Sequence, residues 1–313
     1  MAQLPDWEVI ERDIKIGLVV MADACRYLMG FGTERGETVA AALLGIKSVP
    51  QEHLDDLIED ESFFNSIKAD ETDFFVSTQN CYRFNTSLTP LDKVEVEEMR
   101  IEGRDWLSYF LSSMPSEAMG GGDYSGLFHS PDAPLVLLRD LTTARVDLAE
   151  YVQNFLQFGK SSLILSPREI ALLGDVDIRT VRNAMGPKGN KPIQTELLYA
   201  GARSDMVYGK PLDVIEWLAG RRGFRSGGLS VSWVEGNFEH IKSLDVACAL
   251  PGLLAWLNDQ TSDQLATRLE WNVATVRDWT RAKSITQSQS QIIAEAVGLD
   301  GDKYASLIAR LTA

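Results

Sequence analysis

Two stretches, DVDIRTVRNA at residues 175–184 and EWNVATVRDW at residues 270–279, decide how the C-terminal half of this sequence folds. Both contain Thr-Val-Arg followed by Asn or Asp. When residues 166–184 are aligned with residues 261–279, each copy also starts with Ser or Thr followed three positions later by Glu or Gln. This spacing is the capping box that starts a helix. The chain therefore contains the same local pattern twice.

The repeated pattern is that of two helices joined by a tight turn, a helix-turn-helix. A small alanine on the first helix lets the second helix cross it closely. An apolar residue five positions later plugs the turn, and a valine ten positions after the alanine packs the second helix back onto the first. Aspartate or asparagine caps the second helix. The alanine, cap, plug and valine are Ala171, Asp177, Val176 and Val181 in the first copy and Ala266, Asn272, Trp271 and Val276 in the second.

Because the two valines point inward, their neighbours on the second helix are expected to point outward. Arginine, threonine and asparagine at the start of such a helix are the residue types that reach base edges and phosphates in a major groove. The sequence therefore predicts DNA contacts from two sets of residues, which are Arg179, Thr180, Arg182 and Asn183 in the first copy and Thr275, Arg277 and Arg281 in the second.

The stretch after the first copy contains Gly186-Pro187, which stops a helix, and then a later helix with Trp217-Leu218 near its end. Residues 161–222 thus resemble the winged helix-turn-helix of the excisionase and MerR-like families. The resemblance implies a small β-hairpin, or wing, after the second helix. It also implies that Lys188 and Lys191 contact the DNA backbone from that wing.

The second copy is followed by an Arg-x-Lys-Ser turn, by a helix ending in Val-Gly-Leu and by a final helix. Residues 250–313 thus resemble the five-helix DNA-binding domain of the lambda-type repressor and Cro family. The resemblance implies that the second helix of this copy faces the groove and that Lys283 contacts a phosphate. Residues 1–160 carry no such resemblance.

The predicted protein is mainly α-helical and has three domains. Residues 1–160 form an acidic, mostly helical domain for dimerisation or sensing. Residues 161–225 form the winged helix-turn-helix domain with its small β-hairpin. Residues 226–313 form a linker and the five-helix repressor-like domain.

Apolar periodicity predicts individual elements in and after the N-terminal domain. Helices are expected over residues 7–29 and 135–160. Short strands are expected at KVEVEEMRI, residues 93–101, and at LSVSWV, residues 229–234. Three aromatic residues in one predicted helix, Trp106, Tyr109 and Phe110, are expected in the core.

The charge of the chain is distributed unevenly along its 313 residues. The net charge is −15, which by itself disfavours a nucleic-acid partner. Residues 1–160 carry 28 acidic and 13 basic side chains, whereas residues 161–225 carry seven acidic and ten basic ones. The predicted winged domain is therefore locally basic. The acidic half would suppress non-specific DNA binding, which is mostly electrostatic.

The remaining motifs do not call for an enzyme, a cofactor or a metal ion. GFGTERG at residues 30–36 follows a predicted helix and spaces its glycines unlike a nucleotide-binding loop. No cysteine or histidine lies at metal-ligand spacing. The acidic run DDLIEDE at residues 55–61 is interpreted as a solvated helix face, and binding of a divalent ion is the alternative. The protein is therefore expected to have no catalytic residues.

No apolar run approaches the roughly 20 residues that a membrane helix needs. The N-terminal sequence MAQLPDWEVIERD is acidic, unlike a signal peptide. Three widely spaced cysteines indicate reduced thiols. We therefore expect a cytoplasmic protein without membrane contact.

Two functions follow from these patterns. The first is a sequence-specific DNA-binding protein, a transcriptional regulator that binds double-stranded DNA as a homodimer and senses a protein or small-molecule effector through its N-terminal half. The second is a protein–protein interaction scaffold built from the same folds without DNA binding. The overall charge and Asp278 on the exposed helix face favour the scaffold. A further alternative is that each copy of the repeat is an ordinary pair of packed helices and not a helix-turn-helix.

Overall fold

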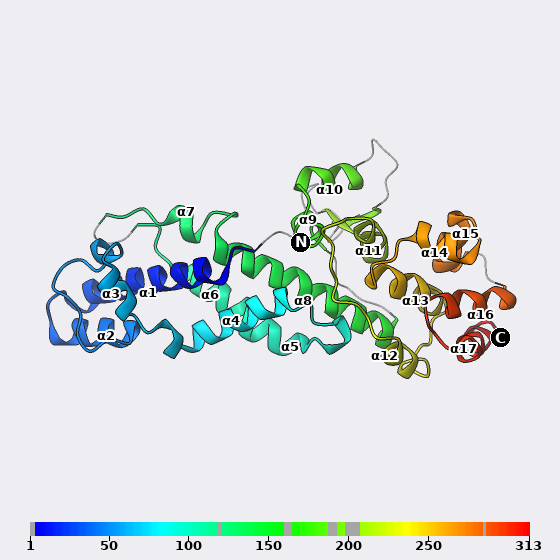
Figure 1. Ribbon diagram of the computed structural model, residues 1–313, viewed down its shortest axis with the longest axis horizontal. Helices are drawn as coiled ribbons and strands as arrows, with labels where there is room; N and C mark the ends of the chain where they lie inside the picture. Colours follow the sequence, from blue (N-terminus) through cyan, green and yellow to red (C-terminus); the bar gives the residue numbers. More distant parts are fainter. Residues whose placement is uncertain (1–3, 118–120, 160–164, 187–192, 198–206, 284–285) are drawn as a thin grey trace. The chain divides into compact units, whose positions relative to one another are not determined.

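The computed structural model describes residues 4–117, 121–159, 165–186, 193–197, 207–283 and 286–313, and these residues are mainly helical (Figure 1). They divide into two compact units. Unit 1 comprises Ser87–Val96 and Thr143–Ala313, and unit 2 comprises Gln3–Thr86 and Glu97–Thr142.

This division differs from the predicted boundaries at residues 160 and 225. One reason is that helix α8 (Pro134–Phe158) continues from unit 2 into unit 1. A second reason is that residues 87–96 hydrogen bond to a segment far along the chain. The Leu91 amide donates to the Gly228 carbonyl at 3.0 Å, and the Ser230 hydroxyl donates to the Asp92 carboxylate at 2.7 Å.

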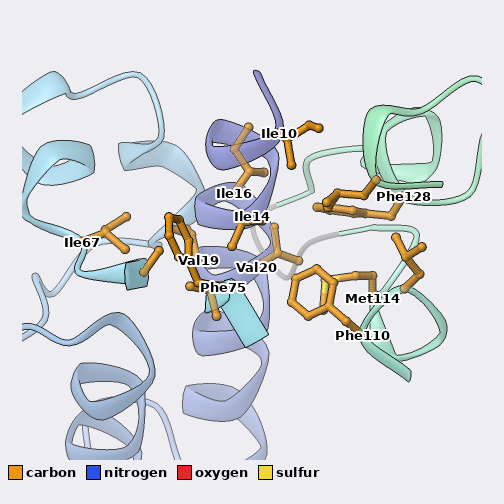
Figure 2. Close-up of a cluster of buried hydrophobic side chains, with 14 of the residues drawn as sticks. Ile10, Ile14, Ile16, Val19, Val20, Ile67, Phe75, Phe110, Met114 and Phe128 are labelled. Atoms are coloured by element: carbon orange, nitrogen blue, oxygen red, sulfur yellow. The ribbon is translucent and has the colours of Figure 1, made fainter. Parts of the chain in front are cut away.

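Unit 2 is built around its first helix, α1 (Trp7–Met29), which begins and ends at the predicted residues. Its buried face carries the isoleucines and valines of a continuous core (Figure 2). Figure 2 shows Ile67 and Phe75 on one side of α1 and Phe110 and Phe128 on the other. The other elements of unit 2 are α2 (Glu34–Leu44), η1 (Asp55–Leu57), α3 (Glu61–Ser66), η2 (Ala69–Glu71), α4 (Asp73–Thr86), α5 (Val96–Glu98), the π-helical η4 (Met99–Asp105), α6 (Trp106–Ser113), α7 (Ser125–Phe128) and the first part of α8.

The described elements of unit 1 are the remainder of α8 and a series of short helices with one strand pair. In order they are η3 (Leu91–Lys93), α9 (Pro167–Gly174), α10 (Ile178–Met185), β1 (Thr195–Leu197), β2 (Val207–Gly209), α11 (Pro211–Ala219), α12 (Val231–Gly236), α13 (Leu244–Leu257), α14 (Ser262–Leu269), α15 (Val273–Thr280), α16 (Gln287–Ala296) and α17 (Gly301–Thr312). Helix α13 is buried over all but its first two residues, because it is apolar around its whole circumference.

Strands β1 and β2 pair antiparallel, with Thr195 opposite Gly209. The residues between them lie outside the described part of the chain, as do Lys188 and Lys191. The predicted wing therefore stays a prediction.

Two predicted strands are wrong. Residues 93–101 form the end of η3, α5 and the start of η4, and LSVSWV leads into α12. In the second segment Ser230, at the N-cap position, is held by Asp92 through both its amide and its hydroxyl. This contact comes from 138 residues away in sequence and starts a helix where the alternating pattern favoured a strand.

The predicted core position of two aromatic residues on α6 is also wrong. Trp106 is 49% exposed and Tyr109 is 70% exposed, whereas Phe110 is buried. Leu107, Phe110 and Leu111 supply the buried face of this helix. Tyr109 lies on the side of the helix opposite this face, and Trp106, four positions before Phe110, lies at its edge, which is why Trp106 is only half exposed.

None of the described helices combines the length and the apolar character needed to span a bilayer.

Candidate nucleic-acid interface

Both predicted helix pairs are present, and both start with the predicted capping box. At α9 the Ser166 hydroxyl accepts from the Glu169 amide at 3.3 Å, and the Glu169 carboxylate accepts from the Ser166 amide at 2.6 Å. At α14 Thr261 and Gln264 exchange the same two hydrogen bonds at 3.2 and 2.8 Å. The sequence repeat is therefore a structural repeat at this end.

The turns inside the two pairs also match. Asp175 and Glu270, at equivalent positions, both adopt the left-handed conformation, with φ of 49° and 56°. The amide of the next residue in each copy donates to the carbonyl of the alanine in the repeat, Ala171 or Ala266, at 3.1 and 2.9 Å. The side chains of Asp177 and Asn272 then cap the second helix. The same chain path is thus used twice.

The packing inside each pair follows the predicted frame. Val181 and Val276 are both completely buried, as predicted. Val176 and Trp271, predicted to plug the turns, are only partly buried. Burial of the valines fixes which side of α10 and of α15 faces away from the first helix of its pair.

Loss of either cap is expected to destabilise the chain by a similar amount. Ser166→Ala and Thr261→Ala each remove the side-chain acceptor of a capping box, which costs about 1 kcal/mol. Urea denaturation followed by circular dichroism would measure the loss. Thr286 precedes α16 without a side-chain cap hydrogen bond, so Thr286→Ala is the control and is expected to change stability little. Equal stability of all three variants with the unsubstituted chain would contradict the role of the caps.

The predicted contact residues of the first pair share one exposed face of α10. All four are exposed, while Val181 and Ala184 on the opposite side are buried. Neither Arg179 nor Arg182 forms an ion pair with any residue that the structure describes. The exposed residues are Arg179, Thr180, Arg182 and Asn183.

The predicted contact residues of the second pair are placed differently. Arg277 on α15 donates from Nε to the Glu216 carboxylate at 2.7 Å. Arg281, just beyond the end of α15, donates from Nη2 to Glu216 at 2.8 Å and to Asp213 at 2.7 Å. Both carboxylates belong to α11. Thr275 is partly buried, and Lys283 is exposed.

The expectation that Arg277 and Arg281 stand free on a groove-facing surface is therefore wrong. The side chain of Arg281 is only 27% exposed, and its Nη2 donates to both Asp213 and Glu216 on α11. Arg277 is half exposed, but its Nε is also committed to Glu216. The physical reason is that α11 presents two acidic residues three positions apart, on one helical face, to this end of α15.

Glu216 is the centre of this contact, which we call the Glu216 network and define as Asp213, Glu216, Ser262, Arg277 and Arg281. Burial raises the pKa of Glu216, but hydrogen bonds from Arg281, Arg277 and Ser262 outweigh it and hold the pKa below its ordinary value of 4.5. Ser262 donates to Glu216 at 2.8 Å and itself accepts from the indole of Trp256. The network thus joins α11 to α14 and α15, and the Trp256 indole connects it to α13.

Sequence reasoning did not identify Glu216. The available signal was the i, i+3 spacing of Asp213 and Glu216 in PLDVIEW, which places two carboxylates on one side of an otherwise apolar helix. Arg277 on α15 and Arg281 just after it supply the basic partners of these two acids.

Comparisons of this chain with models of protein families, with curated proteins and with solved structures found nothing similar to it.

Proposed function

We propose that this protein is a sequence-specific DNA-binding protein, a transcriptional regulator that inserts α10 into the major groove. The observation that carries the proposal is the exposed face of α10 with Arg179, Thr180, Arg182 and Asn183, opposite the completely buried Val181. These side chains can donate to base edges and phosphates. Readers of this kind usually bind paired half-sites, so the proposal includes a homodimer.

The wing is part of the same proposal. Strands β1 and β2 follow α10 and precede α11, which is the order of a winged helix-turn-helix. Lys188 and Lys191 would contact the backbone from this segment. The local excess of basic residues over 161–225 supports the assignment, because backbone contacts supply much of the affinity for DNA.

The experiment that tests the proposal is selection of bound duplexes from a random-sequence pool with the full chain. Enrichment of one motif, with affinity that falls as salt concentration rises, is the expected result. A selected pool without an enriched motif, or no complex even at low salt, would contradict the proposal. Arg35→Ala, which removes an exposed arginine from unit 2, is the control and should select the same motif.

A second candidate function is favoured by the Glu216 network. The groove-facing side of α15 is tied to α11 by ion pairs, so the second helix-turn-helix is arranged as a packing module. If α10 also recognises protein, the chain is an interaction scaffold. The selection experiment distinguishes the two functions, because a scaffold enriches no DNA motif.

A further inference from the structure

Three potential metal ligands from separate parts of unit 2 converge at one place. They are Asp23 on α1, His53 in the segment before η1, and Asp55 at the start of η1. One ligand atom from each residue lies within 4.8 Å of the other two. The distance from His53 Nδ1 to Asp23 Oδ2 is 3.8 Å.

The two carboxylates present buried oxygen atoms that lack partners. Asp23 is completely buried. Its Oδ1 accepts from the Leu54 amide at 3.2 Å, but its Oδ2 has no hydrogen-bond partner among the described residues. Asp55 is 9% exposed, and its buried Oδ1 likewise lacks a partner there. Leaving such oxygens unsatisfied is costly, and a bound cation would satisfy both of them.

The nearby arginine does not neutralise both carboxylates. Arg26 is completely buried, and its Nη1 lies 3.6 Å from Asp23 Oδ1. The same guanidinium donates to Glu37 and to the carbonyls of Pro50 and Glu52. Because Glu37 also carries a negative charge, the single charge of Arg26 does not offset the charges of both Asp23 and Asp55.

The histidine ring is positioned by aromatic neighbours. It stacks on Tyr27 with centroids 5.5 Å apart and on Phe31 with centroids 5.7 Å apart. The Tyr27 hydroxyl also lies 3.0 Å from His53 Nδ1. The same hydroxyl lies 3.1 Å from His53 Nε2, so Tyr27 contacts the imidazole at both ring nitrogens and helps to fix its position. The side chain of His53 is 38% exposed, so solvent can supply further ligands from its side.

We propose that Asp23, His53 and Asp55 bind a divalent transition-metal ion of the Zn²⁺ class. One imidazole nitrogen and two carboxylate oxygens are ligands that Zn²⁺ and similar ions accept, with water completing the coordination. In tetrahedral coordination with bonds of about 2.1 Å, ligand atoms lie about 3.4 Å apart, so side chains up to 4.8 Å apart would move closer by up to about 1.4 Å when the ion binds. The site belongs to unit 2 and is independent of the proposed DNA binding.

The test is a titration of the full chain with Co²⁺, which reports on its ligands by visible absorption, followed by displacement with Zn²⁺. The chain is first freed of metal and kept under reducing conditions. We expect saturation by a single equivalent. His53→Gln and Asp55→Asn should each weaken binding by at least about tenfold, because even residues that only orient a ligand contribute that much. Metal should raise the melting temperature of the unsubstituted chain and not of these variants.

Two matched controls separate this site from accidental binding. Cys25→Ser removes a partly exposed thiol close in sequence to Asp23, and His240→Gln removes an exposed histidine of unit 1. Both should bind Co²⁺ like the unsubstituted chain. Absence of binding by the unsubstituted chain overturns the proposal, and so does binding that Cys25→Ser abolishes while His53→Gln and Asp55→Asn retain it. Because His53 is partly exposed, His53→Gln remains informative if Asp55→Asn fails to fold.

Discussion

Replacing Glu216 by alanine is expected to lower the free energy of unfolding of unit 1 by about 2 kcal/mol, a typical cost of leaving buried polar groups unsatisfied. The Glu216 carboxylate is only 11% exposed and accepts from Arg277, Arg281 and Ser262. Without it, the Ser262 hydroxyl and part of the Arg281 guanidinium lose their partner where water reaches them poorly. The shift of a urea denaturation curve measures the loss.

The three partners of Glu216 do not contribute equally. Arg277 is half exposed, so its ion pair is worth only about 0–1 kcal/mol. Arg281 is more buried but keeps Asp213 as a partner at 2.7 Å when Glu216 is removed. These two facts keep the expected loss below that of a fully buried ion pair. Arg277→Ala is therefore the matched control and should change stability little.

The same prediction has a pH dependence whose sign is fixed by the lowered pKa of Glu216. A carboxyl group with a pKa below its ordinary value in the folded state stabilises the fold at every pH above about 4.5. This contribution is lost as the pH falls through the folded-state pKa. The difference in stability between the unsubstituted chain and Glu216→Ala should thus be constant near neutral pH and shrink in acid. A difference that grows on acidification would contradict the assignment.

The helix-turn-helix pairs were predictable because each is specified by neighbours in sequence. The caps Ser166 and Thr261, their acceptors three positions later and the two buried valines all lie within one stretch of 19 residues per copy. Local hydrogen bonding and helical spacing decide such a motif, and both can be read directly from sequence. The left-handed residues Asp175 and Glu270 follow from the same turn.

Whether the arginines are free of ion pairs within the protein was not predictable in the same way. Arg182 and Arg277 occupy equivalent positions in the repeat, yet only Arg277 meets a carboxylate among the described residues. That carboxylate, Glu216, is 61 residues away in sequence and is delivered by the packing of α11. A pattern within one helix pair therefore predicts which side of a helix faces outward, but not what covers that side.

The cluster of Asp23, His53 and Asp55 escaped sequence analysis for a related reason. Metal sites are recognised in sequence by cysteine and histidine at regular spacing, whereas these three residues come from α1 and from a segment about 30 residues later. Their convergence depends on the fold of unit 2. The acidic run that begins at Asp55 favours a solvated helix face over divalent-ion binding when only its sequence is considered, whereas its first carboxylate is buried in the structure.

The structure predicts opposite outcomes for two arginines that the sequence treats as equivalent. Arg182→Ala should weaken binding to the selected DNA site by about 1–3 kcal/mol, or roughly 5- to 150-fold, and relax specificity at one position of the site. Its side chain is exposed on α10 and forms no ion pair within the described part of the chain. Arg277→Ala should leave the affinity nearly unchanged, because the Arg277 guanidinium is engaged by Glu216.

Binding curves of both variants on the selected site and on a scrambled site measure this difference. The comparison is internally matched, since each substitution removes one arginine from the same position of the same motif. If Arg277→Ala weakens specific binding as much as Arg182→Ala, the Glu216 network must open on DNA, and both helix pairs read the site. If neither variant differs from the unsubstituted chain, direct readout by these helices is wrong. A loss confined to Arg182→Ala assigns recognition to α10 and a packing role to α15.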